Sequence, residues 1–182
     1  MGSSTSDERA LVSEAKALDE GAWEEIFNTY YVRLCTFLRY RVGDASVAED
    51  LASQVLVEAV AGIERYSYRG VPLGAWLFRI ARNVSSDHLR REKRNAKATA
   101  DASGIYDPPQ ASGSDRDDSQ LMLALGQLTS EQRQVVVLRF FSELSTADTA
   151  TVMRKTRGSI KALQHRALAR MRKALVVGSS PA

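Results

Sequence analysis

The residues best placed to do chemistry in this sequence are basic and polar side chains spaced along one helical face near the carboxyl end. The stretch from Thr156 to Lys173 reads TRGSIKALQHRALARMRK and contains no acidic residue. Lys, Arg, Gln and His can meet base edges and phosphates when their helix lies in the major groove of DNA. The candidates for this role are Arg157, Lys161, Gln164, His165 and Arg166. A solvated basic helix that closes a helical bundle is the alternative interpretation of this stretch.

A second set of candidates lies on a short loop. The stretch Gly62–Pro72, GIERYSYRGVP, contains the Gly and Pro residues typical of a loop. Aromatic side chains on a loop can stack on unpaired bases, and a basic helix beside them can hold the strand. The loop candidates are Tyr66, Ser67, Tyr68 and Arg69. We expect at least one of the two tyrosines to pack on the core instead.

The helix predicted after this loop carries polar residues opposite an apolar stripe. Its buried residues are predicted to be Leu73, Trp76, Leu77, Ile80 and Val84. Its polar face adds Arg79, Arg82, Asn83 and Arg90 to the candidates for binding a nucleic-acid strand. The apolar residues and the polar residues both recur at the helical period, on opposite sides of the helix. We therefore predict that one face packs against a core and that the other can contact a polyanion.

The positive charge of the chain is concentrated in two segments. The formal net charge is only +3, but residues 154–173 hold eight Lys or Arg and no acid. Residues 79–97 hold seven basic residues against two acids. Two separated basic segments can neutralise phosphates at two places on one nucleic acid. This distribution favours a nucleic-acid partner.

The remaining composition limits the class of protein. No segment alternates like a hairpin strand, so the prediction is an all-α fold of two small helical domains. His88 and His165 are the only histidines, and no metal-ligand spacing, phosphate-binding Gly loop or nucleophile motif occurs. We therefore expect no enzyme, with no catalytic residue, no cofactor and no metal. Cys35 is the single cysteine, and no signal peptide or long apolar run is present, so a cytoplasmic location is expected.

The helices of the first domain, predicted over residues 7–94, must position the loop. A long helix from Trp23 is expected to end at Gly43, and Ser46 with Glu49 is predicted to form a capping box that opens the next helix. That helix is predicted to bury Ala48, Leu51, Ala52, Val55, Ala59, Val60 and Ile63. Its outward face would then carry Glu49, Asp50, Ser53, Gln54 and Val57. A polar face that only contacts solvent is the alternative interpretation. An apolar Val57 beside acidic residues is also compatible with a face that binds a protein partner.

A flexible linker is predicted over residues 95–119, where Ala, Ser, Gly, Asp and Pro dominate and periodicity is lost. The second domain, predicted over residues 120–176, begins with Leu121, Leu123, Leu125 and Leu128 on a helix. Thr129 and Gln132 are expected to form a capping box, Ser145 to cap a short helix before the basic one, and Thr156 to cap the basic helix itself. A short helix, a tight turn and a basic helix are the elements of a helix-turn-helix. The linker is long enough for the two domains to occupy DNA sites more than one helical turn apart.

Three of these segments resemble bacterial extracytoplasmic-function (ECF) sigma factors. WLFRIARNVSSDHLRREKR (Trp76–Arg94) is similar to part of their second conserved region, and Leu128–Leu175 to their fourth. AEDLASQVL (Ala48–Leu56) resembles the start of the segment with which they hold RNA polymerase. The resemblance covers roughly residues 22–94 and 121–175, most of the chain.

The resemblance implies an initiation subunit that gives core RNA polymerase its promoter specificity. It implies that the loop Tyr66–Arg69 captures a flipped base of the start-proximal element, with Asn83 as a contact beside it. The outward face of residues 49–57 would meet the β′ clamp helices, and the candidates of residues 157–166 would read the upstream element. The β flap is a further part of core polymerase that the chain is expected to contact. An anti-sigma factor is a further expected partner, and no membrane insertion is expected. A one-site helix-turn-helix regulator is the alternative, but it would leave Trp76–Arg94 unexplained.

The sequence also departs from the family pattern. Ser53–Gln54 stands where a Gln-Glu or Gln-Asp pair is common, which bears on the strength of the polymerase contact. Thr149 replaces an isoleucine of the short helix, so apolar burial is expected to be lost there. Leu163 stands where many members have arginine, and Gln164 where many have an apolar residue. This exchange moves the buried position by one residue and is predicted to free Gln164 for reading a base.

Overall fold

The computed structural model describes residues 5–68, 71–98, 121 and 123–178. Every element within these ranges is helical. The first domain consists of α1 (Thr5–Lys16), α2 (Glu20–Val42), α3 (Ala45–Gly62), the 3₁₀ turn η1 (Ile63–Arg65) and α4 (Leu73–Ala98). The second domain contains α6 (Ser130–Val136), the π-helical η2 (Val137–Phe141), α7 (Thr146–Met153) and α8 (Arg157–Gly178).

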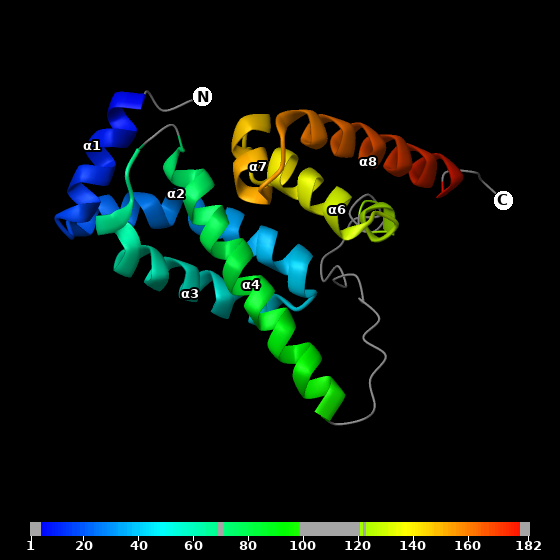
Figure 1. Cartoon of the computed structure of the whole chain (residues 1–182), viewed down its shortest axis with the longest axis horizontal. Coiled ribbons are helices and arrows are strands. Elements are labelled where there is room, and N and C mark those ends of the chain that lie inside the picture. The colour runs from blue at the N-terminus through cyan, green and yellow to red at the C-terminus, as the bar shows by residue number, and fades with distance from the viewer. Residues whose placement is uncertain (1–4, 69–70, 99–120, 122, 179–182) are drawn as a thin grey trace.

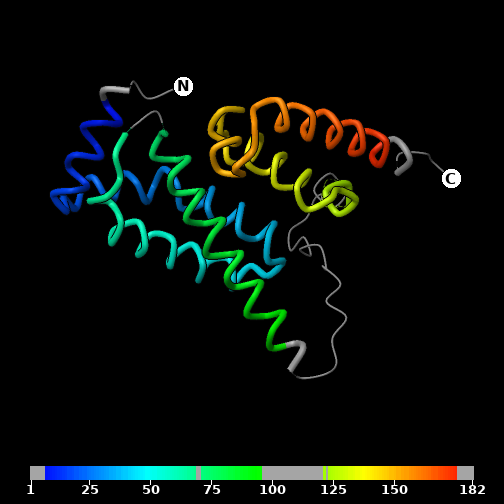
Figure 2. Tube along the Cα trace, in the orientation of Figure 1, coloured from blue at the N-terminus to red at the C-terminus, as the bar shows by residue number. Residues whose placement is uncertain are grey.

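The two domains lie against one another in the structure. Figure 1 shows α3 on one side of α2 and α4, and the helices α6 to α8 on the other. Helix α7 contacts α4, and η2 and α6 contact α2. The far half of α4 extends beyond the other helices (Figure 2), where residues 91–95 are exposed. The predicted linker begins later than expected because α4 continues to Ala98, and residues 99–119 of that linker lie outside the described residues.

Local capping explains where most helices begin and end. Gly43 ends α2 in the left-handed conformation, with φ 89°. Thr129 and Gln132 form the predicted capping box, and the hydroxyl of Ser145 accepts a hydrogen bond from the amide of Asp148 at 3.1 Å. The hydroxyl of Thr156 likewise accepts from the amide of Ser159 at 3.1 Å. These four predictions are confirmed because each rests on residues a few positions apart.

The predicted cap at Ser46 is wrong. The carboxylate of Asp44 accepts a hydrogen bond from the amide of Val47 at 2.8 Å, so Asp44 is the residue that caps α3. Ser46 lies inside the first turn, where it is exposed. An aspartate two residues before the serine offers the same hydrogen bond and adds a negative charge at the positive end of the helix.

The buried faces differ from the predicted stripes at positions where a third element packs on the helix. On α4, Leu73, Leu77 and Val84 are buried as predicted, whereas Trp76 and Ile80 are half-buried. The additional buried residues of α4 include Ala75, Phe78, Ala81 and Ser85. A helix that is covered from two sides buries a wider arc than its apolar stripe predicts, and α4 is covered by the first-domain helices and by α7.

Val60, which was predicted to be buried, and Leu123, which was predicted only to lie on a helix, are both exposed. Val60 is 42% exposed because it lies one residue beyond the buried Ala59 and therefore turns away from the core. Leu123 is 66% exposed, whereas its neighbours Ala124 and Leu125 are buried. Thr149 is the opposite case: it is fully buried, and its hydroxyl oxygen has no hydrogen-bond partner in the structure.

Candidate nucleic-acid interface

The loop after η1 holds its two tyrosines in different environments. Tyr66 is only 4% exposed, its ring centroid lies 4.9 Å from that of Trp76, and its hydroxyl donates to the carbonyl of Val71 at 2.7 Å. Burial raises the pKa of the Tyr66 phenol, with Glu8 and Tyr68 acting in the same direction. Tyr66 is therefore the tyrosine that packs on the core. Because the Tyr66 ring is buried beside Trp76 and its hydroxyl is bonded to Val71, Tyr68 is the better placed of the two rings to stack on a base.

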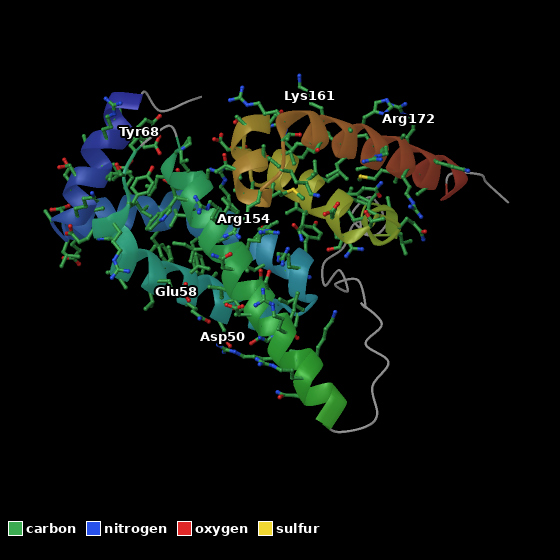
Figure 3. The ribbon with its side chains drawn as sticks, viewed as in Figure 1. Asp50, Glu58, Tyr68, Arg154, Lys161 and Arg172 are labelled. Atoms are coloured by element: carbon green, nitrogen blue, oxygen red, sulfur yellow. The ribbon has the colours of Figure 1, made fainter. Side chains whose placement is uncertain are left out.

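Tyr68 remains partly accessible on the same loop, beside the exposed Ser67. The guanidinium carbon of Arg9 lies 5.2 Å from the centroid of the Tyr68 ring (Figure 3 shows Tyr68 next to α1). Cations favour this position over an aromatic face. Arg69 lies outside the described residues.

Helix α1 also supports the start of α4. The amide of Leu73 donates a hydrogen bond to the carboxylate of Glu8. Leu73 follows Val71 and Pro72 and has no capping side chain in its own sequence neighbourhood, so α1 supplies the anion that the helix start favours. Sequence reasoning missed this role of α1. The sequence contains one indication of this role: no residue just before Leu73 has a side chain that could cap α4, so the cap had to come from elsewhere in the chain.

We expect Glu8→Ala to loosen the loop without unfolding the domain. The substitution removes a charge-assisted hydrogen bond at the helix start, which is typically worth about 0.5–2 kcal/mol. Hydrogen exchange measured by mass spectrometry should speed up at residues 66–76 and remain unchanged in α8. Glu14→Ala, an exposed substitution on the same helix, is the matched control. Equal exchange in both variants would show that Glu8 does not hold the loop.

The polar face of α4 divides into an exposed stripe and a half-buried arginine. Arg79, Asn83 and Arg90 are exposed, and Nη1 of Arg90 lies 3.0 Å from Oδ1 of Asp87. Arg82 is half-buried, and its Nε atom is buried without a hydrogen-bond partner. The exposed stripe lies where a nucleic-acid strand could reach it, whereas Arg82 is partly enclosed.

The enclosed arginine has a second arginine nearby. Arg41 donates to the hydroxyls of Ser85 at 2.7 Å and Ser86 at 3.0 Å. Burial lowers the pKa of Arg41 to about 10, with Arg82 contributing to the same shift. Ser86 in turn donates to the carbonyl of Arg82 at 2.6 Å. This network fixes the middle of α4 against the end of α2.

The outward face of α3 is exposed at all of its predicted positions, namely Glu49, Asp50, Ser53, Gln54 and Val57. The Gln54 amide donates to Glu58 at 3.0 Å, and the Ser53 hydroxyl donates to the carbonyl of Glu49 at 3.1 Å. Val57 is 68% exposed. Asp50 and Glu58 lie on the opposite side of the molecule from Lys161 and Arg172 (Figure 3). The face is therefore free to meet a partner while the basic helix α8 remains accessible.

The outward face of α3 is extended by apolar residues of α2, which were not predicted to lie on this surface. Phe27 and Tyr31 of α2 stack with centroids 4.5 Å apart, and Phe27 is 46% exposed. Tyr31 lies close enough to Ser53 and Glu49 of α3 for both to influence its pKa, which partial burial raises. With Val57 and Val60 exposed as well, α2 and α3 present large apolar side chains beside acids. The sequence offered one indication, which is that Phe27 and Tyr31 are spaced four residues apart on a helix.

The helix-turn-helix of the second domain forms as predicted. A tight turn at Arg154, with φ 53°, joins α7 to α8. Helix α8 buries Ile160, Leu163, Ala167 and Met171. Its exposed candidates are Arg157, Lys161, His165 and Arg166. Lys161 and Arg172 point outward from α8 in Figure 3, so this face is available to a polyanion.

Gln164 occupies an intermediate position. It is half-buried, and its side-chain oxygen accepts a hydrogen bond from Nε of Arg139 at 3.3 Å. The predicted exchange of positions is present, because Leu163 is buried next to it. Gln164 is thus not free as expected: Arg139 of η2 holds it at the edge of the basic face.

The comparisons with known proteins agree with this geometry. Residues 26–95 match the family model for sigma-70 region 2, and residues 124–173 match that for sigma-70 region 4. The chain is 35% identical over 163 residues to the ECF RNA polymerase sigma factor BldN of Streptomyces coelicolor, covering 87% of this chain and 62% of that protein. It is 30% identical over 176 residues to SigD of Mycobacterium tuberculosis, covering 92% of this chain and 83% of SigD.

A solved structure shows the same arrangement of helices. The sigma factor RpoE from Bartonella quintana, crystallised in complex with the anti-sigma factor NepR, superposes with a TM-score of 0.69 at 27% identity, covering 85% of this chain and 96% of RpoE. Among the described residues, no helix combines the length and the hydrophobicity needed to cross a bilayer. Both sigma regions are matched, in the expected order along the chain. The chain therefore belongs to the ECF RNA polymerase sigma factors, the promoter-recognising subunits of bacterial transcription initiation.

Proposed function

We propose that this sigma factor divides its work among three surfaces. The α3 face around Asp50 and Val57 binds core RNA polymerase at the β′ clamp helices. The loop at Tyr68 and the exposed stripe of α4 open and hold the start-proximal element, and α8 reads the upstream element as duplex. The observation that carries this proposal is the separation of the surfaces: an acidic and apolar face lies opposite the basic face of α8 (Figure 3).

The start-proximal surface has the parts that strand capture requires. A partly accessible ring at Tyr68 offers a stacking partner, and the cations Arg79 and Arg90 lie on the helix that follows the loop. Base stacking on an aromatic side chain is worth about 1–3 kcal/mol, whereas unstacking a base costs a few kcal/mol. The ring therefore acts together with the phosphate contacts of α4, and Asn83 lies between those two cations on the exposed stripe.

The upstream surface contains residues for phosphate contact and residues for base reading. Arg157, Lys161 and Arg166 can neutralise phosphates, while Gln164 and His165 can donate to or accept from base edges. Because Arg139 holds Gln164 at 3.3 Å, its amide is oriented before DNA binds. An oriented side chain loses less conformational freedom on binding.

Replacing Gln164 with alanine is expected to relax sequence preference at one position of the upstream element. The loss for the preferred base pair should be about 1–3 kcal/mol, with little change for DNA that already carries another pair there. Binding of the full chain, held by core polymerase, to a set of single-base promoter variants measures this. Arg170→Ala, an exposed basic residue on the same helix, should instead weaken all sequences alike or have no effect. Equal losses on every sequence for Gln164→Ala would contradict a base-reading role.

We also propose that an anti-sigma factor regulates the chain in the cytoplasm. The crystallised complex of the similar RpoE with NepR supports this proposal. The stacked pair of the exposed Phe27 and the half-buried Tyr31, together with Val57 and Val60, offers apolar area that either polymerase or such an inhibitor would cover. Competition between the two for one surface would make their binding mutually exclusive.

Co-elution with core polymerase tests the proposed function. The full chain should form a stable one-to-one complex with core enzyme on gel filtration, and a one-site helix-turn-helix regulator should not. A chain that binds duplex DNA but never co-elutes with core enzyme would favour that alternative.

A further inference from the structure

Helix α1 is anchored to the first domain near both of its ends. Its buried residues Val12 and Ala15 belong to the same hydrophobic cluster as Leu73 of α4. Near the carboxyl end of α1, the indole nitrogen of Trp23 donates a hydrogen bond to the carbonyl of Ala15 at 3.1 Å. Near the amino end, the carboxylate of Glu8 accepts a hydrogen bond from the amide of Leu73. These contacts fix the position of α1 beside the start of α4.

The residue after Glu8, Arg9, contacts the loop that precedes α4. Its guanidinium carbon lies 5.2 Å from the centroid of the Tyr68 ring, and Figure 3 shows Tyr68 next to α1. Arg9 is exposed, and no carboxylate of the described residues forms an ion pair with it. The face of an aromatic ring attracts a cation. Within the part of the chain that the structure describes, the Tyr68 ring is thus the partner that holds the Arg9 guanidinium.

The contact with Arg9 makes the two faces of the Tyr68 ring unequal. Arg9 covers one face, and no other ring or cation among residues 5–68, 71–98, 121 and 123–178 is paired with Tyr68. A base that stacked on the covered face would have to displace Arg9 and lose the contact between the cation and the ring. A base that stacked on the other face would keep it. The uncovered face is therefore the favoured position for a base.

The same contact restricts the orientations of the Tyr68 ring before any DNA is bound. A side chain that must adopt one orientation to bind loses conformational freedom, and a contact made in advance lowers that cost. When only a fraction of free molecules has the ring correctly oriented, the apparent dissociation constant rises by the inverse of that fraction. An exposed cation–π contact is strong enough to change such a fraction by about 2- to 5-fold.

We propose that Arg9 is a positioning residue of the start-proximal surface, which holds one face of the Tyr68 ring so that the other face receives an unpaired base of single-stranded DNA. Helix α1 then contributes to this surface together with the loop and α4. The inference rests on the proposed role of Tyr68 in strand capture. It differs from two other roles for Arg9: a contact with a phosphate, which would not depend on the captured base, and a cover that a base must displace, which would weaken binding.

Binding of single-stranded DNA to the full chain in complex with core polymerase tests the proposal. The probe is an oligonucleotide that spans the start-proximal element of a promoter whose start site has been mapped by transcription. A series of probes with one abasic site each identifies the captured base, because loss of that base removes the stacking on Tyr68 and weakens binding of the unmodified chain most.

Arg9→Gln should weaken binding of the intact probe about 2- to 5-fold, because the ring is no longer held. Arg9→Lys retains a cation over the ring and should retain most of the affinity. Lys16→Gln removes the same charge from the other end of α1 and should bind like the unmodified chain. Because Arg9 is exposed, the circular dichroism spectrum of each variant should match that of the unmodified chain.

Two further comparisons show whether Arg9 acts through the ring. Arg9→Gln should cause no additional loss in a chain that already carries Tyr68→Ala, and none on the probe that lacks the captured base. An equal loss on that abasic probe would indicate a phosphate contact, and tighter binding by Arg9→Gln would indicate a cover; either result would overturn the proposal. Unchanged binding by Arg9→Gln beside weak binding by Tyr68→Ala would overturn the role of Arg9 alone. Unchanged binding by Tyr68→Ala would overturn strand capture by this loop, and the role of Arg9 with it.

Discussion

Replacing Tyr68 with alanine is expected to reduce open-complex formation on a duplex promoter about tenfold or more. Stacking of a base on an aromatic ring is worth about 1–3 kcal/mol, and alanine removes it. The closed complex should form nearly as before, because its affinity comes from phosphate contacts and from polymerase. Permanganate reactivity of thymines in the start-proximal element measures opening directly. Asn83→Ala, on the exposed stripe of α4, should have the same kind of effect.

A pre-melted bubble template distinguishes a role of Tyr68 in strand capture from a role in folding or in polymerase binding. It supplies the unstacking free energy in advance, so it should restore much of the transcription lost by Tyr68→Ala. Tyr66→Ala serves as the contrast, because that ring is buried against Trp76 and its removal should cost about 3–5 kcal/mol of folding stability. The bubble should not rescue a Tyr66 variant that fails to fold. If Tyr68→Ala is not rescued either, the loop acts in folding or polymerase binding rather than in strand capture.

Reversing the charge at Asp50 is expected to weaken binding to core polymerase by about tenfold or more. Asp50 is exposed on the α3 face, and a lysine there would meet the partner with the wrong sign. Truncating one partner of a close interfacial charge pair often costs 2–5 kcal/mol, and a rim charge less. Affinity for core enzyme, measured by fluorescence anisotropy with labelled protein, gives the effect. Binding of duplex DNA should be unchanged, because α8 lies on the opposite side of the molecule (Figure 3).

Glu14→Lys on α1 is the control for Asp50→Lys, since it makes the same charge change at an exposed position off the α3 face. Val57→Ser offers a second test without any change of charge. Because Val57 is 68% exposed, the substitution should leave the thermal midpoint unchanged while lowering affinity for core enzyme. Unchanged affinity in both Asp50→Lys and Val57→Ser would remove the α3 face from the polymerase interface.

The features that the sequence predicted correctly depend on residues close together in the chain. The caps at Thr129, Ser145 and Thr156 each need one side chain and an amide three residues away. The buried stripe of α8 follows from helical spacing alone. The incorrect cap prediction at Ser46 misses the true cap by only two positions, because Asp44 accepts the same type of hydrogen bond.

The features that escaped prediction depend on contacts between distant residues. Nothing local distinguishes Tyr66 from Tyr68; Trp76 and the carbonyl of Val71 bury the first. The brace from Glu8 joins residues 65 positions apart, and the bond from Arg33 to Ser142 joins residues 109 apart. The hydrogen bond from Arg139 to Gln164 likewise joins two different helices. It occupies the Gln164 side chain, which was predicted to be free.

Reconstituted transcription tests the central claim most directly. Core RNA polymerase, the purified chain and fragmented DNA from the same organism should together yield transcripts with defined start sites. Mapped starts should share two upstream elements at a constant spacing, one for each DNA-binding surface. Core enzyme alone should yield none of these starts, and Asp50→Lys should abolish or strongly reduce them. Defined starts preceded by only one shared element, or no new starts at all, would contradict a sigma factor that recognises promoters with both domains.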